Sequence, residues 1–270
     1  MRVSVKQLKM AWSCPRQWAM HYLFDVATVE GEALAVGNAV HGQMKSLIQG
    51  TEPAHGPESR IGKMARELIQ YAEPRSAKAV SEIIKLVELP EYGIKVDLRC
   101  DFMDLCPPNR PQAVFKDWKT TGAESAKSKL PNGALWALDD LSDDWQANIY
   151  AFLLMHSHWK VPVVEAEWCF VSKKFKEGQT PKTWRVPHVF HYPTTKAWFD
   201  KMVPPTVALI REMKEAHAAK TLDTGLLAPH NPASCEYTGK FCDAAGHCRM
   251  VSSPVIQYHQ LGLPTLKGKT

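Results

Sequence analysis

Two acidic residues and a lysine stand close together in the middle of the chain, on either side of a proline-rich segment. Asp101 comes before that segment, and the tripeptide Asp117-Trp118-Lys119 comes after it. Two carboxylates that meet need a cation between them, and acidic oxygen ligands suit Mg²⁺ or Mn²⁺, which keep open positions for water and phosphate. A lysine beside such an ion could orient or deprotonate a water molecule for attack on a phosphodiester.

Residues 96–121 are predicted to form the two strands that bring these side chains together. β-favouring residues lie on both sides of the prolines, which cannot continue a ladder, so a hairpin is the simplest interpretation. An antiparallel pair that turns near Asn109 pairs positions whose numbers sum to about 218, which sets Asp101 opposite Asp117. Because side chains alternate along a strand, Asp117 and Lys119 share one face. The alternative is an exposed hairpin whose charges are only solvated.

The composition is that of a folded globular protein. The chain has 270 residues, of which 45% are hydrophobic and 23% charged, enough for one large domain or one domain with appendages. Its net charge of +5 would help it bind a polyanion. It contains no run of 18 apolar residues and no signal-peptide pattern, so we expect a cytoplasmic protein without a membrane segment.

Before the hairpin, helical spacing predicts one segment over residues 4–26, divided at Pro15, and another over 32–49, followed by a shorter helix at 61–73 and a strand at 79–89. Cys14 then lies near the start of a helix, where the thiolate is favoured, although a buried small hydrophobe is the commoner role. His41 lies in the second helical segment. A single histidine there is either structural or a ligand.

After the hairpin, a loop over residues 122–142 leads to a helix that starts with a Ser142 cap and an acidic first turn. Gln146 and Tyr150 are four residues apart and share one face of it, for hydrogen bonding either at the surface or at a site. Strands are predicted at 161–171 and 183–190, joined by a lysine-rich turn, and a helix at 194–220. The pattern predicts an α/β fold with a central mixed sheet of about five strands flanked by helices.

Three cysteines close to the C-terminus form a second pattern that indicates metal ligation, since core packing does not explain them in a loop rich in Gly, Ser and Pro. They are Cys235, Cys242 and Cys248. Soft thiolates select zinc or an iron–sulfur cluster, and the candidates for a fourth ligand are Cys14, His230 and His247. Cys100, Cys106 and Cys169 sit in or beside predicted strands and are expected to be apolar fillers.

The ordered set of motifs resembles the RecB-like branch of the PD-(D/E)xK nucleases, and within it the members with an iron–sulfur cluster, such as the AddB nuclease domain and the CRISPR-associated exonucleases. The likeness spans residues 4–250. The motifs are Cys14-Pro15-Arg16, Gly37-Asn38-Ala39-Val40-His41, Leu98-Arg99-Cys100-Asp101, Asp117-Trp118-Lys119, Gln146-x-x-x-Tyr150 and the three late cysteines. The chain departs from the family where Leu98 replaces a usual glycine and in the wider gap between Cys235 and Cys242.

The resemblance implies a role for each matched residue. His41, Asp101 and Asp117 would be the metal ligands, with the Trp118 carbonyl as an extra one, and Lys119 would be the catalytic lysine. Gln146 and Tyr150 would support the site and contact DNA. Cys14 would join Cys235, Cys242 and Cys248 around a 4Fe-4S cluster that ties the two ends of the chain together, with zinc as the alternative.

The resemblance also implies an activity and an architecture. The expected enzyme is a Mg²⁺- or Mn²⁺-dependent exonuclease that hydrolyses single-stranded DNA or DNA ends, with a helicase or a recombination or repair protein as a partner. The expected architecture is a single nuclease domain over residues 1–270. Its restriction-endonuclease-like core covers about 30–220, and residues 4–26 and 228–250 form the cluster-binding arm. The alternative is a nucleic-acid-binding module, stapled by the cysteine cluster, without catalytic activity.

Overall fold

The computed structural model describes residues 1–26, 32–72, 79–105, 112–125, 141–156 and 160–222. The chain divides into two compact units. One comprises Met1–Val29 with Phe199–Thr270, and the other comprises Glu30–Trp198. Each unit is described by itself below.

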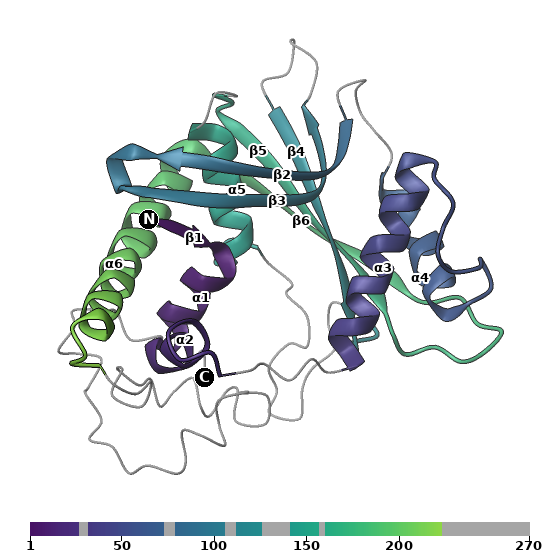
Figure 1. Cartoon of the computed structure of the whole chain (residues 1–270). Coiled ribbons are helices and arrows are strands. Elements are labelled where there is room, and N and C mark those ends of the chain that lie inside the picture. The colour runs from purple at the N-terminus through teal and green to yellow at the C-terminus, as the bar shows by residue number, and fades with distance from the viewer. Residues whose placement is uncertain (27–31, 73–78, 106–111, 126–140, 157–159, 223–270) are drawn as a thin grey trace. The chain divides into compact units, whose positions relative to one another are not determined.

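The larger unit is built on a mixed sheet (Figure 1). Neighbouring strands are antiparallel for β2 with β3, β3 with β4, and β5 with β6, whereas β4 and β5 run parallel. This arrangement confirms the predicted α/β class with a mixed central sheet. The strands are β2 (Ala79–Leu89), β3 (Ile94–Leu105), β4 (Gln112–Thr121), β5 (Val163–Ser172) and β6 (Thr183–His191).

The register of β3 against β4 agrees with the one expected from the sequence. The pairs run from Phe102 with Lys116 to Leu105 with Ala113, so that paired numbers sum to 218. The predicted hairpin is therefore confirmed as an antiparallel pair, and its proline-rich turn lies outside the described residues. At the other end of β3, the short 3₁₀ helix η2 (Pro90–Tyr92) connects β2 to β3. Gly93 follows it with φ of 62°, a left-handed conformation that glycine adopts without strain.

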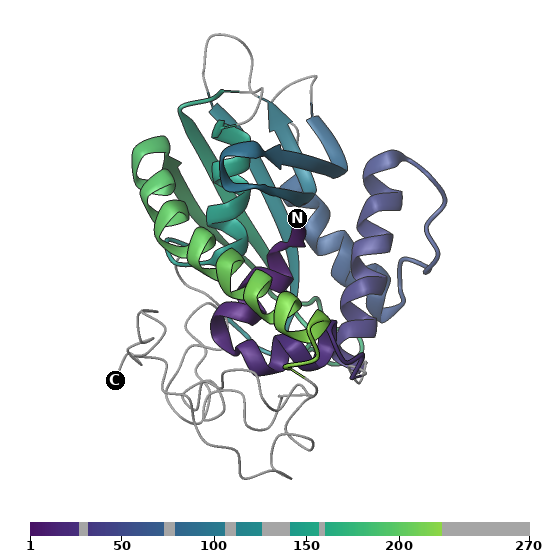
Figure 2. The ribbon, with the colours of Figure 1, turned by 60° about the vertical axis from the view of Figure 1, so that its left-hand side comes forward.

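Two helices cover one face of this sheet, α3 (Glu32–Gln49) and α4 (Arg60–Ile69), followed by the 3₁₀ turn η1 (Gln70–Ala72) (Figures 1 and 2). Val40 and Met44 of α3 and Met64 and Leu68 of α4 are fully buried. They pack with strand residues that share one side of the sheet: Phe102, Trp118, Cys169 and Val171. Trp118 thus points into this core, as the alternation along β4 requires.

The helix α5 (Trp145–His156) lies against the opposite face. Phe115, on the same face of β4 as Asp117, contacts Tyr150 of α5 with ring centroids 6.0 Å apart. Residues of α5 are buried almost all round, which is typical of a helix enclosed on several sides. The predicted Ser142 cap is wrong: the Asp144 carboxylate accepts the hydrogen bond from the backbone N–H of Ala147, 2.9 Å away, so the helix starts two residues later.

The smaller unit contains β1 (Arg2–Ser4), α1 (Val5–Ser13), α2 (Pro15–Tyr22) and the part of α6 (Tyr192–Ala218) that follows Trp198. Ser4 caps α1 through a capping box with Gln7. Pro15 occupies the first turn of α2 and divides the two helices, as predicted. Leu8, Trp12 and Trp18 are buried. In the part of the chain that is described, no helix combines the length and apolar character needed to cross a membrane.

Candidate active site

The candidate site lies where β3 and β4 separate. The ladder between them ends at the pair of Phe102 with Lys116, so Asp101 and Asp117, the next positions, are no longer bridged by backbone hydrogen bonds. The Asp101 side chain fills the gap: its Oδ2 accepts a hydrogen bond from the backbone N–H of Trp118 at 2.7 Å. The point where β3 and β4 separate, just beyond the pair of Phe102 with Lys116, is called the fork here. At this point the Asp101 carboxylate, in place of a backbone carbonyl, accepts the N–H of β4, and both acidic residues lie where the strands begin to separate.

Asp117, Lys119 and Gln146 form a closed set of contacts within this fork. The Gln146 amide donates from Nε2 to Asp117 Oδ1 at 2.6 Å, and the Lys119 ammonium donates to Gln146 Oε1 at 3.0 Å. The same ammonium forms an ion pair with Asp117 Oδ2 and lies 5.2 Å from the centroid of the Trp168 ring. Gln146 thus fixes both the acid and the base of the Asp-x-Lys tripeptide from the neighbouring helix.

His41 approaches the site from α3. Its Nδ1 lies 3.3 Å from Asp101 Oδ1. One helical turn earlier, Gly37 faces Thr120 so closely that an added Cβ would stand 3.4 Å from the threonine Oγ1. Gly37 thus marks a place where α3 lies close to β4, on the same face of the helix as His41, which is four residues further on.

The pKa values of these groups show how strongly they interact. Burial raises the pKa of Asp117 to about 6, although the Lys119 charge opposes the shift. Burial lowers the pKa of Lys119, but the negative charge and hydrogen bond of Asp117 more than reverse that effect, so its pKa is raised. Burial likewise lowers the pKa of His41, and its hydrogen bond to Asp101 with the Asp101 charge raises it overall. Such coupled shifts are typical of functional sites.

The site is closed on its Asp117 side and open on the other. The Asp117 side chain is 5% exposed, whereas those of Asp101, Lys119 and His41 are 19%, 32% and 35% exposed. A substrate could therefore reach Lys119 and His41 without displacing Asp117 from its buried position. This asymmetry suits a site in which one carboxylate is held rigidly and the remaining groups meet an incoming ligand.

The donor set matches a hard divalent cation, with two carboxylates and one imidazole, but the side chains are not gathered around a common point. Among the described residues, no three acidic, histidine or cysteine side chains form a ready metal cluster. Asp117 Oδ2 is buried and carries the Lys119 ion pair, while Asp101 is occupied by Trp118 N–H and His41. Binding a cation here would exchange the ammonium at Asp117 for the ion, which the negative charge of the site favours.

Tyr150, the other residue of the predicted helical pair, is buried at 5% exposure. Its ring packs on Phe115, and burial raises the pKa of its phenol. The structure therefore brings Gln146 into direct contact with Asp117 and Lys119 and places Tyr150 one turn deeper, beneath the site. The Trp118 side chain lies on the opposite face of the sheet, so only its backbone can contribute here.

Asp144 and Asn148 also position the site, and the sequence analysis did not identify them. The Asn148 amide donates to the carbonyls of Ser142 at 2.7 Å and Asp144 at 2.9 Å, and Asp144 caps the helix that carries Gln146. The signal was present, because an asparagine between the apolar Ala147 and Ile149 is a buried polar group that needs partners.

Three of the seven cysteines lie in the part of the chain that the structure describes. Cys14 is buried at the N-cap of α2, as predicted, and makes no capping hydrogen bond with its side chain. Cys100 and Cys169 are buried free thiols, which agrees with their expected role as apolar fillers. Cys106, Cys235, Cys242 and Cys248, with the alternative ligands His230 and His247, lie outside the described residues. The 4Fe-4S cluster and its zinc alternative therefore stay predictions.

Comparison with known proteins gives a family match over the first third of the chain. The sequence profile of the PD-(D/E)XK nuclease superfamily matches residues 2–93. This stretch includes Cys14 and His41 and ends before Asp101. No curated protein matches the chain.

Among solved structures, a "Putative exonuclease" from Eubacterium rectale superposes with a TM-score of 0.54 at 17% sequence identity, over 93% of this chain and 90% of that chain. At this identity the likeness shows a shared fold. The protein SSO0001 is similar over 92% of this chain and 86% of its own, with a TM-score of 0.39 and 11% identity, and carries no weight here.

Proposed function

We propose that this protein is a nuclease of the PD-(D/E)XK type, which hydrolyses phosphodiester bonds in DNA with the help of Mg²⁺ or Mn²⁺. The observation that carries the proposal is the fork between β3 and β4, where Asp101, Asp117 and Lys119 meet with Gln146 and His41. The family match over residues 2–93 and the fold shared with the protein from Eubacterium rectale support it independently.

In this proposal Asp101, Asp117 and His41 hold the cation, with the Trp118 carbonyl as a further ligand. When bound, the ion supplies charge to polarise the scissile phosphate and to acidify a water molecule. Lys119 donates hydrogen bonds to the attacking water and to the phosphate oxygen that gains charge, which stabilises the transition state. Gln146 keeps the ammonium and Asp117 aligned through its two contacts.

We further propose the finer assignments that the resemblance implies. The preferred substrate is single-stranded DNA or a DNA end, attacked exonucleolytically. Cys14, Cys235, Cys242 and Cys248 hold a 4Fe-4S cluster, or zinc in its place. The buried Cys14 thiol, whose side chain makes no capping hydrogen bond, is consistent with a ligand role. A helicase or a recombination or repair protein is the expected partner.

The decisive experiment measures cleavage of 5′-labelled single-stranded and blunt duplex DNA with Mg²⁺, with Mn²⁺ and with EDTA. The wild type should give metal-dependent products. Asp117→Asn and Lys119→Met should each lower the rate by about 10³-fold, because each removes a group that acts on the reacting phosphate or holds the ion. Asp143→Asn removes one exposed carboxylate near the same helix and should cleave like the wild type.

Full activity of either site variant would refute the assignment of Asp117 and Lys119. DNA binding by the wild type without products in any metal would instead favour a binding module. Internal fragments formed from a circular single strand would contradict exonucleolytic attack while leaving the hydrolytic site intact.

A further inference from the structure

A lysine-rich loop lies at the same end of the sheet as the candidate site. Residues 173–182, which join β5 to β6, are called the basic loop here. They include one acidic residue, Glu177, and four lysines: Lys173, Lys174, Lys176 and Lys182. With four lysines and one glutamate, the loop has a net charge of about +3, in a chain whose net charge is +5.

The basic loop starts directly beside the strand of the Asp-x-Lys tripeptide. The backbone N–H of Lys173 donates to the carbonyl of Thr121 at 2.7 Å. Thr121 lies two residues beyond Lys119 on β4, which corresponds to about 7 Å of strand. A polymer that occupies the site and continues along this edge would therefore meet the loop within one or two phosphates.

The first half of the loop is held in place and is not a free tip. The Arg60 guanidinium on α4 donates from Nη2 to the Lys173 carbonyl at 2.6 Å and lies 5.8 Å from the centroid of the Phe175 ring. Further on, the N–H of Gln179 donates to the Lys176 carbonyl at 3.0 Å, and the N–H of Lys176 donates to Gln179 Oε1 at 3.1 Å. These contacts fix the loop backbone, so the loop loses less conformational entropy when a ligand binds.

Lys173 and Lys176 keep their charge available. In the described part of the chain, no carboxylate lies within ion-pair distance of Lys173 or Lys176. Lys182, near the loop's end, stands 3.8 Å from Glu124, with both side chains more than half exposed. Such an exposed pair contributes little, so it neutralises the lysine only weakly.

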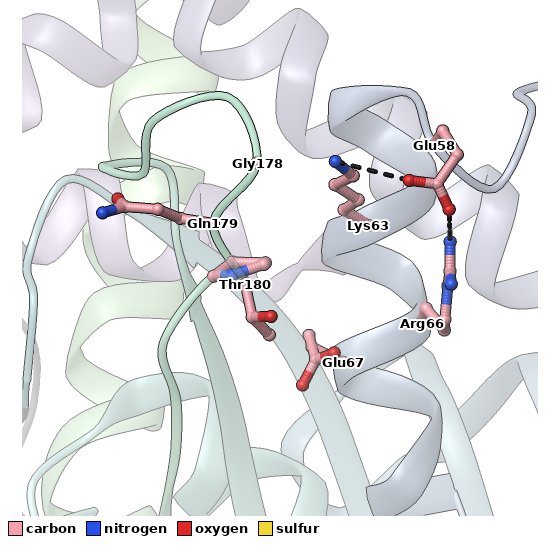
Figure 3. A pocket seen from close by; sticks show the side chains of 8 residues that line it. Glu58, Lys63, Arg66, Glu67, Gly178, Gln179 and Thr180 are labelled. Carbon is pink, nitrogen blue, oxygen red and sulfur yellow. Dashed lines mark hydrogen bonds and ion pairs between the residues drawn. The ribbon is translucent and has the colours of Figure 1, made fainter.

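The hollow between the basic loop and α4 is different (Figure 3). There Glu58 forms ion pairs with Lys63 at 3.5 Å and with Arg66 at 3.1 Å, and Glu67 lines the same hollow. Two acids balance two bases, so this hollow has no excess charge to attract an anion. The lysines of the basic loop do not line this hollow, so their positive charge lies elsewhere on the loop.

We propose that Lys173 and Lys176 bind the phosphate backbone of the DNA strand next to the cleaved bond. This inference rests on the proposed function and adds to it the surface that holds the substrate outside the site. The contact is independent of sequence, because lysine ammonium groups meet phosphates as point charges and the one aromatic side chain of the loop, Phe175, is half-buried beside Arg60.

The test measures binding of a long labelled single-stranded oligonucleotide in EDTA, by fluorescence anisotropy over a series of salt concentrations. Each lysine that neutralises a phosphate contributes about 0.7 to the slope of log K against log salt, which is about 5-fold in Kd near 0.1 M salt. The double variant Lys173→Gln/Lys176→Gln should therefore weaken binding by about 25-fold and lower the slope by about 1.4. The single variant Lys176→Gln should give half of each logarithmic change.

Lys160→Gln is the matched control. Lys160 is exposed and lies just before β5, at the opposite end of the strand from Lys173, and its substitution changes the net charge by the same single unit as Lys176→Gln, with which it is compared. It should bind DNA with the wild-type Kd and slope. An equal weakening by Lys160→Gln would mean that the total charge, and not the basic loop, attracts DNA, and the proposal would be wrong.

Failure of this inference can be told apart from failure of the proposed function. Wild-type hydrolysis of bis(p-nitrophenyl) phosphate with Mn²⁺ tests the site without any long backbone. If the wild type hydrolyses this compound and the loop variants bind DNA like the wild type, only the loop assignment fails. If the wild type hydrolyses neither this compound nor DNA, the nuclease proposal fails, and the inference about a cleaved strand fails with it.

Discussion

Asp117 lies in an environment that opposes its own negative charge. The carboxylate is buried to 5% exposure, and its pKa of about 6 lies well above the ordinary value of 3.8. Because the folded pKa is raised, the carboxyl group stabilises the fold below about pH 4, and this contribution is lost as the pH rises through 6. The metal-free site is thus strained electrostatically near neutral pH, and a bound cation would relieve that strain.

A first prediction follows for the protein in EDTA. Between about pH 4 and pH 8 the ionisation of Asp117 should cost roughly 2 to 3 kcal/mol of folding free energy, since each pKa unit corresponds to about 1.4 kcal/mol. Asp117→Asn removes this cost. The Tm of the variant relative to wild type should therefore rise from about pH 4 to about pH 6 and stay level above about pH 7, as measured by thermal unfolding at several pH values.

The control for this prediction is Asp143→Asn, which changes an exposed carboxylate. Its Tm difference from wild type should stay nearly constant over the same pH range. A Tm difference for Asp117→Asn that is equally flat would show that Asp117 ionises normally in the folded protein. Saturating Mn²⁺ should abolish the advantage of the variant, because the wild type alone keeps the charge that binds the ion.

At the residue scale, the sequence predicted which side chains meet but not how they are held. The position of the turn near Asn109 was enough to set Asp101 opposite Asp117, and the period of two along a strand was enough to separate Trp118 from Lys119. It could not show that the ladder stops at Phe102. That depends on how far β3 and β4 diverge, which is decided by the helices packed on each face.

At the scale of the elements, α4 depends on a glycine at a close contact. Gly62 lies in the first turn of α4, and a Cβ there would stand 2.2 Å from the Gly56 carbonyl oxygen, which is backbone and cannot rotate away. The loop before α4 must therefore pass directly over this position. The same helix supplies Arg60, so a shift of its first turn would also move the basic loop.

The second prediction compares two glycines. Gly62→Ala should lower the free energy of unfolding by about 2 kcal/mol or more, because the new methyl group forces backbone apart. Gly42→Ala on α3 meets nothing within 4 Å and should raise it by up to about 1 kcal/mol through helix propensity. Urea unfolding of both variants measures the difference, and a stabilised Gly62→Ala would show that the loop can move aside freely.

Helices and strands were predicted largely correctly, while the start of α5 was not. Ser142 and Asp144 both lie where a cap is expected, and the choice between them depends on the Asn148 amide, which holds the carbonyls of both residues. That interaction exists only when α5 is already packed on the sheet. Local preference alone therefore placed the helix start two residues early.

At the scale of the whole molecule, the ends of the chain pose the remaining question. The chain divides into two units, and Cys14 sits at the start of α2 in the smaller one. The proposed cluster would join it to residues more than two hundred positions away, and closing so long a loop restricts the unfolded chain strongly. Metal analysis and absorbance of the purified protein test this pairing directly.

The third prediction concerns protein purified without oxygen. A 4Fe-4S cluster gives absorbance at about 400 nm, and Cys14→Ser should abolish it and lower the Tm by about 5 to 10 °C. Cys169→Ala, in the core beneath α3 and α4, should keep the absorbance. If the protein is colourless and binds one zinc ion, the site holds zinc and no iron–sulfur cluster. If it contains neither iron nor zinc, the proposed cysteine site is wrong.

Asp101 has a structural role as well as a proposed role as a metal ligand, and this affects the choice of an inactive variant for trapping DNA. Its carboxylate closes the fork by accepting the N–H of Trp118, so replacing it removes a structural bridge together with a proposed ligand. Lys119 makes no comparable contact with the backbone in the described structure, and its loss leaves the strands joined as before. An inactive variant that still binds an uncut DNA strand is therefore better made by substituting Lys119 than by substituting Asp101.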